Sequence, residues 1–241
     1  MPAAIEIDLL PEAGLVIYPA RLHGAACALL EDGSAGHRAG HKPFSAGPVT
    51  GCGPVASWRL GWLRDGACVE PAWVRFGDSR CRVLEVRQQR ASYAELACTE
   101  PARWAEVELV SPMYFSRNGR DLPLPEPVLM VRSALARWNA HAPPGLAVDE
   151  ELSRTLVSAV YLREACGGTR RAPVSATMTQ TGFVGTAVLG LTRAADERVA
   201  RVVAALMTFA GIAGFGAQTT HGFGATVLRA LGPRRPTRPA P

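Results

Sequence analysis

Lysine is almost absent from this chain of 241 residues. One of the 26 Lys+Arg residues, Lys42, is lysine, so 26 minus 1 leaves 25 arginines. With 21 acidic residues the formal net charge is +5, a mild excess that permits an anionic partner without requiring one. Apolar residues make up 48% of the chain and charged residues 20%, which is typical of a globular protein and excludes a disordered chain.

Other absences exclude further classes of protein. The longest weakly polar stretch, residues 202–215, is interrupted by Thr208 and Gly211 and is too short to span a bilayer. The first residues lack a basic stretch followed by an apolar core, so we expect no secretory signal, no membrane contact and a cytoplasmic location. The six cysteines form no C-x-x-C pair, which gives no support for a zinc ribbon and favours reduced thiols.

Hydrophobic periodicity predicts two successive β-α-β-β-α-β passes. In the first half the expected strands are residues 3–10, 44–49, 57–64, 80–86 and 93–98, with a helix at 21–31 and a weaker helix between 69 and 77. In the second half the expected strands are 104–115, 157–166, 174–191 and 224–231, with helices at 128–141, after Asp149 and at 194–213. This order predicts an α+β fold of tandem ferredoxin-like (RRM-like) domains, each an antiparallel sheet with helices on one face. We expect domains at 1–102 and 103–231, followed by a disordered basic tail at 232–241.

The most informative segment is a glycine-rich loop, residues 211–226, with the sequence GIAGFGAQTTHGFGAT. Glycine lets the backbone approach a ligand closely and exposes N–H groups to phosphate oxygens. A P-loop is excluded because no G-K-[S/T] follows, and a dinucleotide site is excluded because the loop follows a helix and precedes a strand. A helix end and a bulged strand start would account for only one or two of the glycines. We therefore predict that the loop binds a nucleic-acid backbone or base, through Gly214, Gly216, Gln218, Thr219, Thr220, His221, Gly222 and Gly224.

This late helix, the G-x-G-x(5)-G-x-G loop and the closing strand resemble the signature of the RAMP superfamily of CRISPR-associated proteins. Three other segments agree: LVSPMYF at 109–115, the loop and helix at 122–139 with the pair Trp138-Asn139, and QTGFVGTAVLG at 180–190. Within the superfamily the chain is most similar to the endoribonucleases that process CRISPR precursor RNA. The resemblance covers essentially the whole chain and is loosest between residues 65 and 102.

The resemblance implies an active site just after the first helix, where a histidine precedes Lys-Pro-Phe and a strand. Residues 37–45, HRAGHKPFS, fit that pattern. Cleaving RNA without a metal requires activating a 2′-hydroxyl, stabilising a phosphorane and protonating the 5′-oxygen. Histidine exchanges protons near neutral pH, and lysine supplies a compact cation. We expect His37 to be the general base or acid and Lys42 the electrostatic stabiliser, with His41 as the competing histidine.

Alternatives remain open at this loop. His23, on the first helix, is a further candidate if it faces the same cleft. Some members of the family have a tyrosine in the middle of that helix, and its absence here leaves open whether histidine and lysine act alone. A zinc site at His37 and His41 needs further ligands, and only Glu31 and Asp32 are near in sequence, so we expect no metal and no other cofactor.

The resemblance implies a metal-independent endoribonuclease that cuts the repeat of the precursor transcript, leaving a 5′-hydroxyl and a 2′,3′-cyclic phosphate. The implied partners are CRISPR repeat RNA or crRNA and subunits of an effector complex, with the protein acting as a monomer or homodimer. We expect Arg38, and Arg170 and Arg171 at a hairpin tip, to contact the RNA. The alternative is a non-catalytic RAMP subunit that binds crRNA in an effector complex, which has no need of the His37–Lys42 loop.

Overall fold

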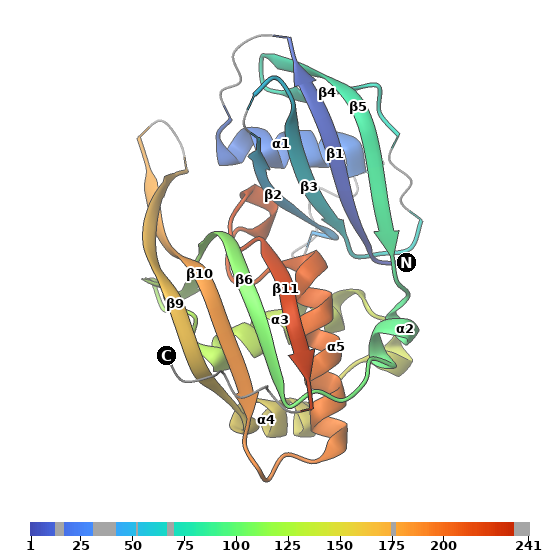
Figure 1. The fold of residues 1–241 in the computed structure, drawn as a ribbon, viewed down its shortest axis with the longest axis vertical. Coiled ribbons are helices and arrows are strands. Elements are labelled where there is room, and N and C mark those ends of the chain that lie inside the picture. The colour runs from blue at the N-terminus through green and yellow to red at the C-terminus, as the bar shows by residue number, and fades with distance from the viewer. Residues whose placement is uncertain (13–16, 31–41, 52, 67–69, 175–176, 234–241) are drawn as a thin grey trace, which may run out of the picture.

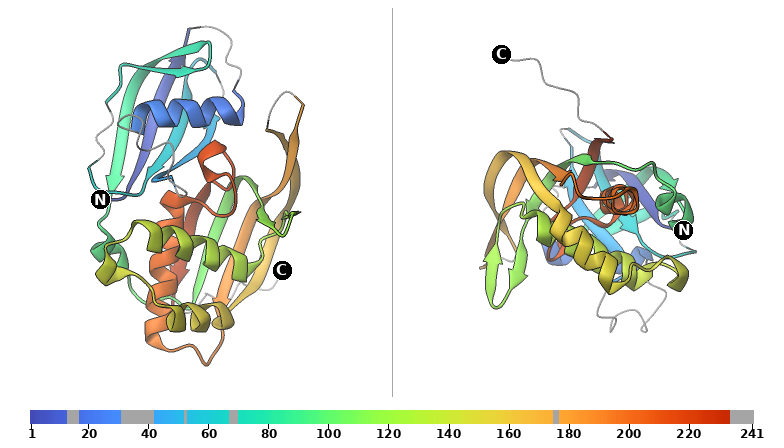
Figure 2. Two further views of the ribbon diagram at one scale, coloured as in Figure 1. Left: turned by 180° about the vertical axis from the view of Figure 1, so that it is seen from behind. Right: turned by 90° about the horizontal axis from the view of Figure 1, so that it is seen from below.

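Two antiparallel sheets lie end to end, each with its helices on one face (Figure 1). The computed structural model describes residues 1–12, 17–30, 42–51, 53–66, 70–174 and 177–233. Seen from behind, helices of both units cross in front of their sheets, so the helices lie on the same side of the molecule (Figure 2). The opposite faces of both sheets are therefore turned the same way.

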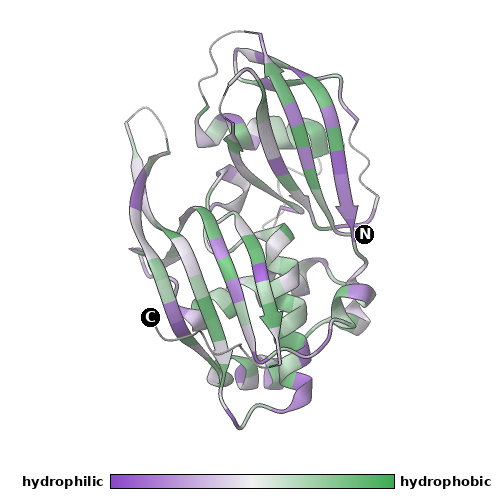
Figure 3. Ribbon diagram, viewed as in Figure 1, coloured by the Kyte–Doolittle hydropathy of each residue, from purple (hydrophilic) through white to green (hydrophobic). Residues whose placement is uncertain are grey.

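The N-terminal sheet has five strands in the order β2-β3-β1-β5-β4. Its elements are β1 (Ala3–Pro11), α1 (Pro19–Leu30), β2 (Phe44–Thr50), β3 (Ala56–Trp62), β4 (Trp73–Phe76) and β5 (Ser79–Arg90). The alternation predicted for the first strand is confirmed, because Ile5, Ile7 and Leu9 are fully buried and their neighbours are more exposed. Figure 3 shows this alternation of hydrophobic and hydrophilic residues along β1. The buried side of the sheet packs against Leu22 and Ala26 of α1.

Two elements predicted for the first half are wrong. The expected strand at 93–98 is a helix, α2 (Tyr93–Ala97), because Ser92 and Glu95 form a capping box: Ser92 Oγ accepts from Glu95 N, and the Glu95 carboxylate accepts from Ser92 N. The expected helix between 69 and 77 is instead strand β4, which pairs with β5 and buries Val74 and Phe76. The place of the second helix of a ferredoxin-like unit is therefore taken by a β-hairpin.

The C-terminal sheet has four strands in the order β11-β6-β10-β9, and its elements follow the predicted order. They are β6 (Trp104–Met113), a short hairpin of β7 (Phe115–Arg117) and β8 (Arg120–Leu122), α3 (Pro127–His141), α4 (Glu150–Ala159), β9 (Val160–Pro173), β10 (Thr179–Leu191), α5 (Glu197–Ala213) and β11 (Thr226–Gly232). Two 3₁₀ turns, η2 (Pro144–Leu146) and η3 (Thr219–His221), complete the unit. The predicted N-cap is confirmed, since Asp149 accepts a hydrogen bond from Leu152 N. Gly232, expected in the tail, belongs to β11, and residues 234–241 lie outside the described residues.

The two units are joined by direct contacts as well as by the chain. Leu63, after β3, and α2 belong to the hydrophobic core of the C-terminal unit. Side chains of the N-terminal sheet also cap the end of α5, where Ser45 Oγ donates to Ile212 O at 2.6 Å and Arg59 Nη2 donates to Gly211 O at 3.1 Å. Both acceptors belong to the first two residues of the glycine-rich segment 211–226, in the last turn of α5, so these contacts position that segment against the N-terminal sheet. None of the helices in the described part of the chain has the length and hydropathy of a membrane span.

Candidate functional site

The glycine-rich loop lies at the junction of the two units and packs through η3 against α1 and β2 (Figure 1). The chain leaves α5 at Gly214 and joins β11 at Thr226. Phe215 and Phe223, the central residues of the two G-F-G triplets, are buried, whereas Gln218 is exposed. The loop is therefore anchored by its aromatic residues and exposes Gln218 between them.

The close approaches of Gly214 and Gly224 are to the protein's own backbone. Both have positive φ, +75° and +61°. Gly224 O accepts from Phe215 N at 2.9 Å, and a Cβ on Gly214 would lie only 2.7 Å from that same oxygen. Gly216 and Gly222 also have positive φ and a close neighbour, the Tyr114 carbonyl and the Leu22 side chain respectively. The expectation that the fold needs only one or two of these glycines is therefore wrong, and their contact with RNA stays a prediction.

His221 of the loop stacks on His23 of α1. The ring centroids are 4.1 Å apart and the planes differ by 3°. Thr220 Oγ1 lies 2.9 Å from His221 Nδ1, and Cys27 Sγ lies 3.5 Å from His23 Nε2, so both rings are oriented by a neighbour. Burial, together with the charge of His23, lowers the pKa of His221 to about 4. His221 is consequently neutral at pH 7, and the fold brings together two histidines that the sequence left separate.

Lys42 stands two residues before Phe44, the first residue of β2. It is half-buried, and the two residues that follow it are held in place: Pro43 O accepts from Leu63 N at 2.8 Å, and the Phe44 ring lies 5.7 Å from the His23 ring. His37, Arg38 and His41, which occupy the sequence between α1 and Lys42, lie outside the described residues.

Arg137 of α3 is a residue of this region that sequence reasoning missed. Its Nη2 donates to Phe44 O at 3.1 Å, and its Nη1 donates to Thr219 Oγ1. Burial lowers the pKa of the Arg137 guanidinium to about 10, so it remains charged at neutral pH. No sequence pattern marks this role. One acceptor of Arg137 is a backbone carbonyl, which every residue has, so in the sequence Arg137 cannot be distinguished from a surface arginine of a helix.

Arg170 and Arg171 lie within strand β9 rather than at a hairpin tip. They pair with Gly182 and Thr181 of β10, because β9 continues to Pro173 before the chain turns. The predicted tip is therefore wrong. Both side chains are exposed, and Arg171 Nη2 donates to Thr179 Oγ1 at 2.9 Å.

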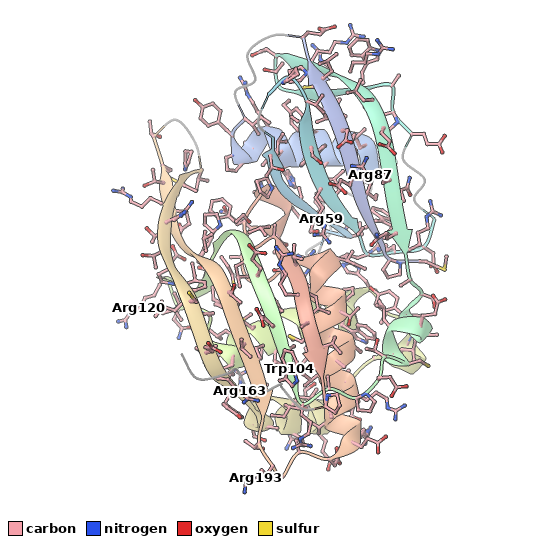
Figure 4. All side chains as sticks on the ribbon, viewed as in Figure 1. Arg59, Arg87, Trp104, Arg120, Arg163 and Arg193 are labelled. Atoms are coloured by element: carbon pink, nitrogen blue, oxygen red, sulfur yellow. The ribbon has the colours of Figure 1, made fainter. Side chains whose placement is uncertain are left out.

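A cavity of about 210 Å³ opens between β2, β3, the end of α5 and the inner side of the loop. Arg59 lines it and lies on β3 beside the second sheet (Figure 4). Burial lowers the pKa of Arg59. Arg87, on the same sheet, is engaged with carboxylates instead, at 2.8 Å from Asp8 and 2.5 Å from Glu85. Arg59, whose Nη2 donates to Gly211 O, thus points toward the junction between the units.

No cluster of three or more histidine, cysteine, aspartate or glutamate side chains suited to a metal ion occurs among the described residues. The described groups that meet at the loop are instead two histidines, an arginine and two threonine hydroxyl groups. Such groups can exchange protons and offset the charge of a phosphate.

The chain is similar to one family of known proteins. The sequence model of a family described as CRISPR-associated endoribonuclease Cas6 matches residues 107–226. No curated protein sequence gives a significant match.

Solved structures extend the similarity over 95% of the chain. A Cas6 product complex is 30% identical, with 95% of this chain and 100% of that chain covered and a TM-score of 0.82. A second Cas6 product complex, of a protein from Thermus thermophilus, is 26% identical over the same shares, also with a TM-score of 0.82. A RAMP protein binding different RNA substrates is 12% identical, covers 95% of this chain and 100% of that chain, and has a TM-score of 0.52. This last likeness concerns the fold alone, and the predicted fold class of tandem ferredoxin-like domains is confirmed.

Proposed function

Because this chain belongs to the Cas6 family of CRISPR-associated endoribonucleases, we propose that it cleaves the repeat of CRISPR precursor RNA to release crRNA without using a metal ion. The observation that carries the proposal is the similarity to a Cas6 solved as a product complex, which extends over the full length of that Cas6 chain. The groups assembled around the loop support it, because they offer proton exchange and positive charge at one place.

The proposed reaction is a transesterification within the RNA. The 2′-oxygen attacks the adjacent phosphorus, the bond from phosphorus to the 5′-oxygen breaks, and a 2′,3′-cyclic phosphate and a 5′-hydroxyl result. His37 removes the proton of the 2′-hydroxyl or supplies the proton of the leaving 5′-oxygen, and His41 is the alternative for this role. Lys42 offsets the charge that develops on the phosphate oxygens. The contacts that hold Pro43 and Phe44, the two residues after Lys42, support this assignment.

We further propose that residues 1–102 carry the catalytic loop and residues 103–231 the RNA-binding loop. The RNA contacts proposed in the second unit are the loop residues 214, 216, 218–222 and 224, with Arg170 and Arg171 on the exposed strand β9, while Arg38 contributes from the catalytic loop. The cleaved RNA is then kept by the protein or passed to subunits of an effector complex.

Cleavage of a repeat RNA in EDTA tests the proposal. The purified protein is mixed in excess with repeat RNA from its host, and the single-turnover rate, the RNA affinity and the end groups of the products are measured. We expect cleavage in EDTA, and in His37→Ala a rate at least about 10²-fold lower with an affinity within a few-fold of wild type. Lys42→Ala is expected to lose rate as well, and Lys42→Arg to lose less.

The outcomes separate the alternatives. If His41→Ala loses the rate and His37→Ala does not, the two histidines exchange roles. Cleavage that requires a divalent ion contradicts the metal-independent mechanism. Tight binding with no cleavage under any condition identifies the chain as a non-catalytic RAMP subunit.

A further inference from the structure

Helix α3 holds the glycine-rich loop with two side chains one turn apart. Ser133 Oγ accepts a hydrogen bond from Gly216 N at 2.9 Å, and Arg137 Nη1 donates to Thr219 Oγ1. These contacts fix the loop on both sides of Gln218. Of the two, only Arg137 also reaches the N-terminal unit, through Phe44 O at 3.1 Å.

The burial of the Arg137 guanidinium is energetically unfavourable. Its Nε is enclosed without a hydrogen-bond partner among the described residues, and none of the ion pairs formed by those residues involves its guanidinium. A desolvated cation usually needs a carboxylate partner, and without one its burial is unfavourable. A stability role alone would be served as well by an apolar side chain at this site.

The two groups that Arg137 binds lie close in the sequence to Lys42, the candidate catalytic lysine, and to His221, a candidate RNA contact. Phe44 O lies two residues after Lys42, and Thr219 lies two residues before His221. The neighbouring carbonyl, Pro43 O, is already fixed by Leu63 N at 2.8 Å, so the chain that carries Lys42 is tethered at successive residues. A planar guanidinium can hold both partners at once in a fixed relative orientation, whereas an ammonium is a single point donor.

We propose that Arg137 is a positioning residue for the cleavage reaction: by binding Phe44 O and Thr219 together, it holds Lys42 in register with the loop turn that carries His221. This proposal rests on the proposed endoribonuclease function. A misplacement of about 1 Å at a reacting centre can cost about 10²-fold in rate, so a residue that sets the spacing acts on the chemical step rather than on RNA affinity.

The test compares Arg137→Met, Arg137→Lys and Thr219→Val with Ser133→Ala as the matched control. Ser133→Ala removes a loop contact of the same helix but leaves the Phe44 contact intact. For each protein the single-turnover cleavage rate, the affinity for repeat RNA and the melting temperature are measured. We expect Arg137→Met to cleave about 10- to 100-fold more slowly with an affinity within about 3-fold of wild type. Arg137→Lys is expected to recover part of the rate, and Ser133→Ala to stay within about 2-fold of wild type.

Several results would overturn the proposal. They are an Arg137→Met rate close to wild type, a loss of affinity as large as the loss of rate, or an equal loss in Ser133→Ala. If Arg137→Met does not fold, Thr219→Val decides, because it keeps the side-chain volume and removes one acceptor; a wild-type rate in that variant contradicts the proposal. A wild-type protein that binds repeat RNA without cleaving it refutes the proposed function instead, which distinguishes the two failures.

Discussion

Gly224 closes the glycine-rich loop in a backbone conformation that a residue with a side chain adopts only at a cost. Its φ is +61°, and an L-residue in the left-handed region loses about 1–2 kcal/mol. A Cβ at this position would also overlap the Phe215 carbonyl oxygen and lie 3.0 Å from the carbonyl carbon. Backbone atoms cannot swing away as a side chain can, so overpacking adds about 1–3 kcal/mol. We therefore expect Gly224→Ala to lower the free energy of unfolding by about 3 kcal/mol.

Thermal and urea unfolding measure this loss. For a chain of this length about 3 kcal/mol corresponds to a melting temperature lower by about 6–12 °C. Gly222→Ala is the graded control: its φ is +92°, but the only close neighbour of a new Cβ is the Leu22 Cδ1 methyl at 2.7 Å, which can rotate away. It should cost about 1–2 kcal/mol. Gly145→Ala, where a Cβ meets nothing within 4 Å, should lie within about 0.5 kcal/mol of wild type.

The same measurements separate a structural glycine from a ligand-binding one. If Gly224→Ala unfolds like wild type but binds repeat RNA more weakly, then this glycine serves the approach of the RNA. The closure of the loop on its own backbone would then be of little importance to stability, and the reasoning above is refuted.

Two further predictions concern charge. The pKa of His221 is about 4 when folded and about 6.5 when unfolded, so the unfolded chain binds more protons between these values and stability is lost as the pH falls from 6.5 towards 4. The full pKa shift corresponds to about 3 kcal/mol of stability, which the partial exposure of the ring reduces to about 1–2 kcal/mol. In His221→Asn the drop in unfolding free energy between pH 7.5 and pH 4.5 should be smaller than in wild type by about 1–2 kcal/mol. An unchanged pH dependence in this variant would contradict the argument that burial lowers the pKa of His221. Replacing Arg170 and Arg171 together by alanine should weaken RNA binding and lower the slope of log affinity against log salt by about 1.5. The same charge change at Arg154 and Arg198, which pair with acidic residues on the helical side, should leave the slope as it is, and equal slopes for the two double variants would argue against RNA on β9.

The second half of the fold was predictable because its elements are long and one-sided. The helix expected at 128–141 begins one residue earlier in the structure, and the helix expected at 194–213 is α5, which runs from Glu197 to Ala213. The strand expected at 157–166 is displaced instead, running from Val160 to Pro173. Most residues of this strand are exposed, so its sequence lacks the alternation of apolar and polar residues that would mark where the strand begins and ends.

The first half was less predictable because two short-range signals compete with hydrophobic periodicity. Ser92 and Glu95 stand at capping-box spacing, and this local pair starts a helix where alternation suggests a strand. Trp73 to Phe76 alternate before Gly77-Asp78, a two-residue turn that favours a hairpin over a helix. Both signals were present in the sequence, and they carry more weight than the short apolar run around them.

The residues of the candidate site also differ in how well the sequence predicts them, because some belong to a local sequence pattern and others do not. The glycine-rich loop and Lys42 stand in recognisable motifs, so they were identified from the sequence. The stack of His23 on His221 joins residues that are far apart in the sequence, and each of these histidines alone is equally compatible with a surface position. Their proximity is a product of the docking of α1 on η3.

The contacts that hold the two units together explain why this docking is hard to read from a sequence. Ser45, Arg59 and Arg137 each donate from a side chain in one unit to a backbone carbonyl of the other, namely Ile212 O, Gly211 O and Phe44 O. Every residue type supplies such an acceptor, so the receiving positions carry no compositional mark. A donor that binds a carbonyl fixes the path of the backbone itself. In this chain the fixed segments are the end of α5, where the glycine-rich loop begins, and the start of β2 after Lys42. Two of these donors, Arg59 and Arg137, lie outside both motifs, so we expect substitutions at the junction to change the rate of cleavage without removing a contact to the RNA.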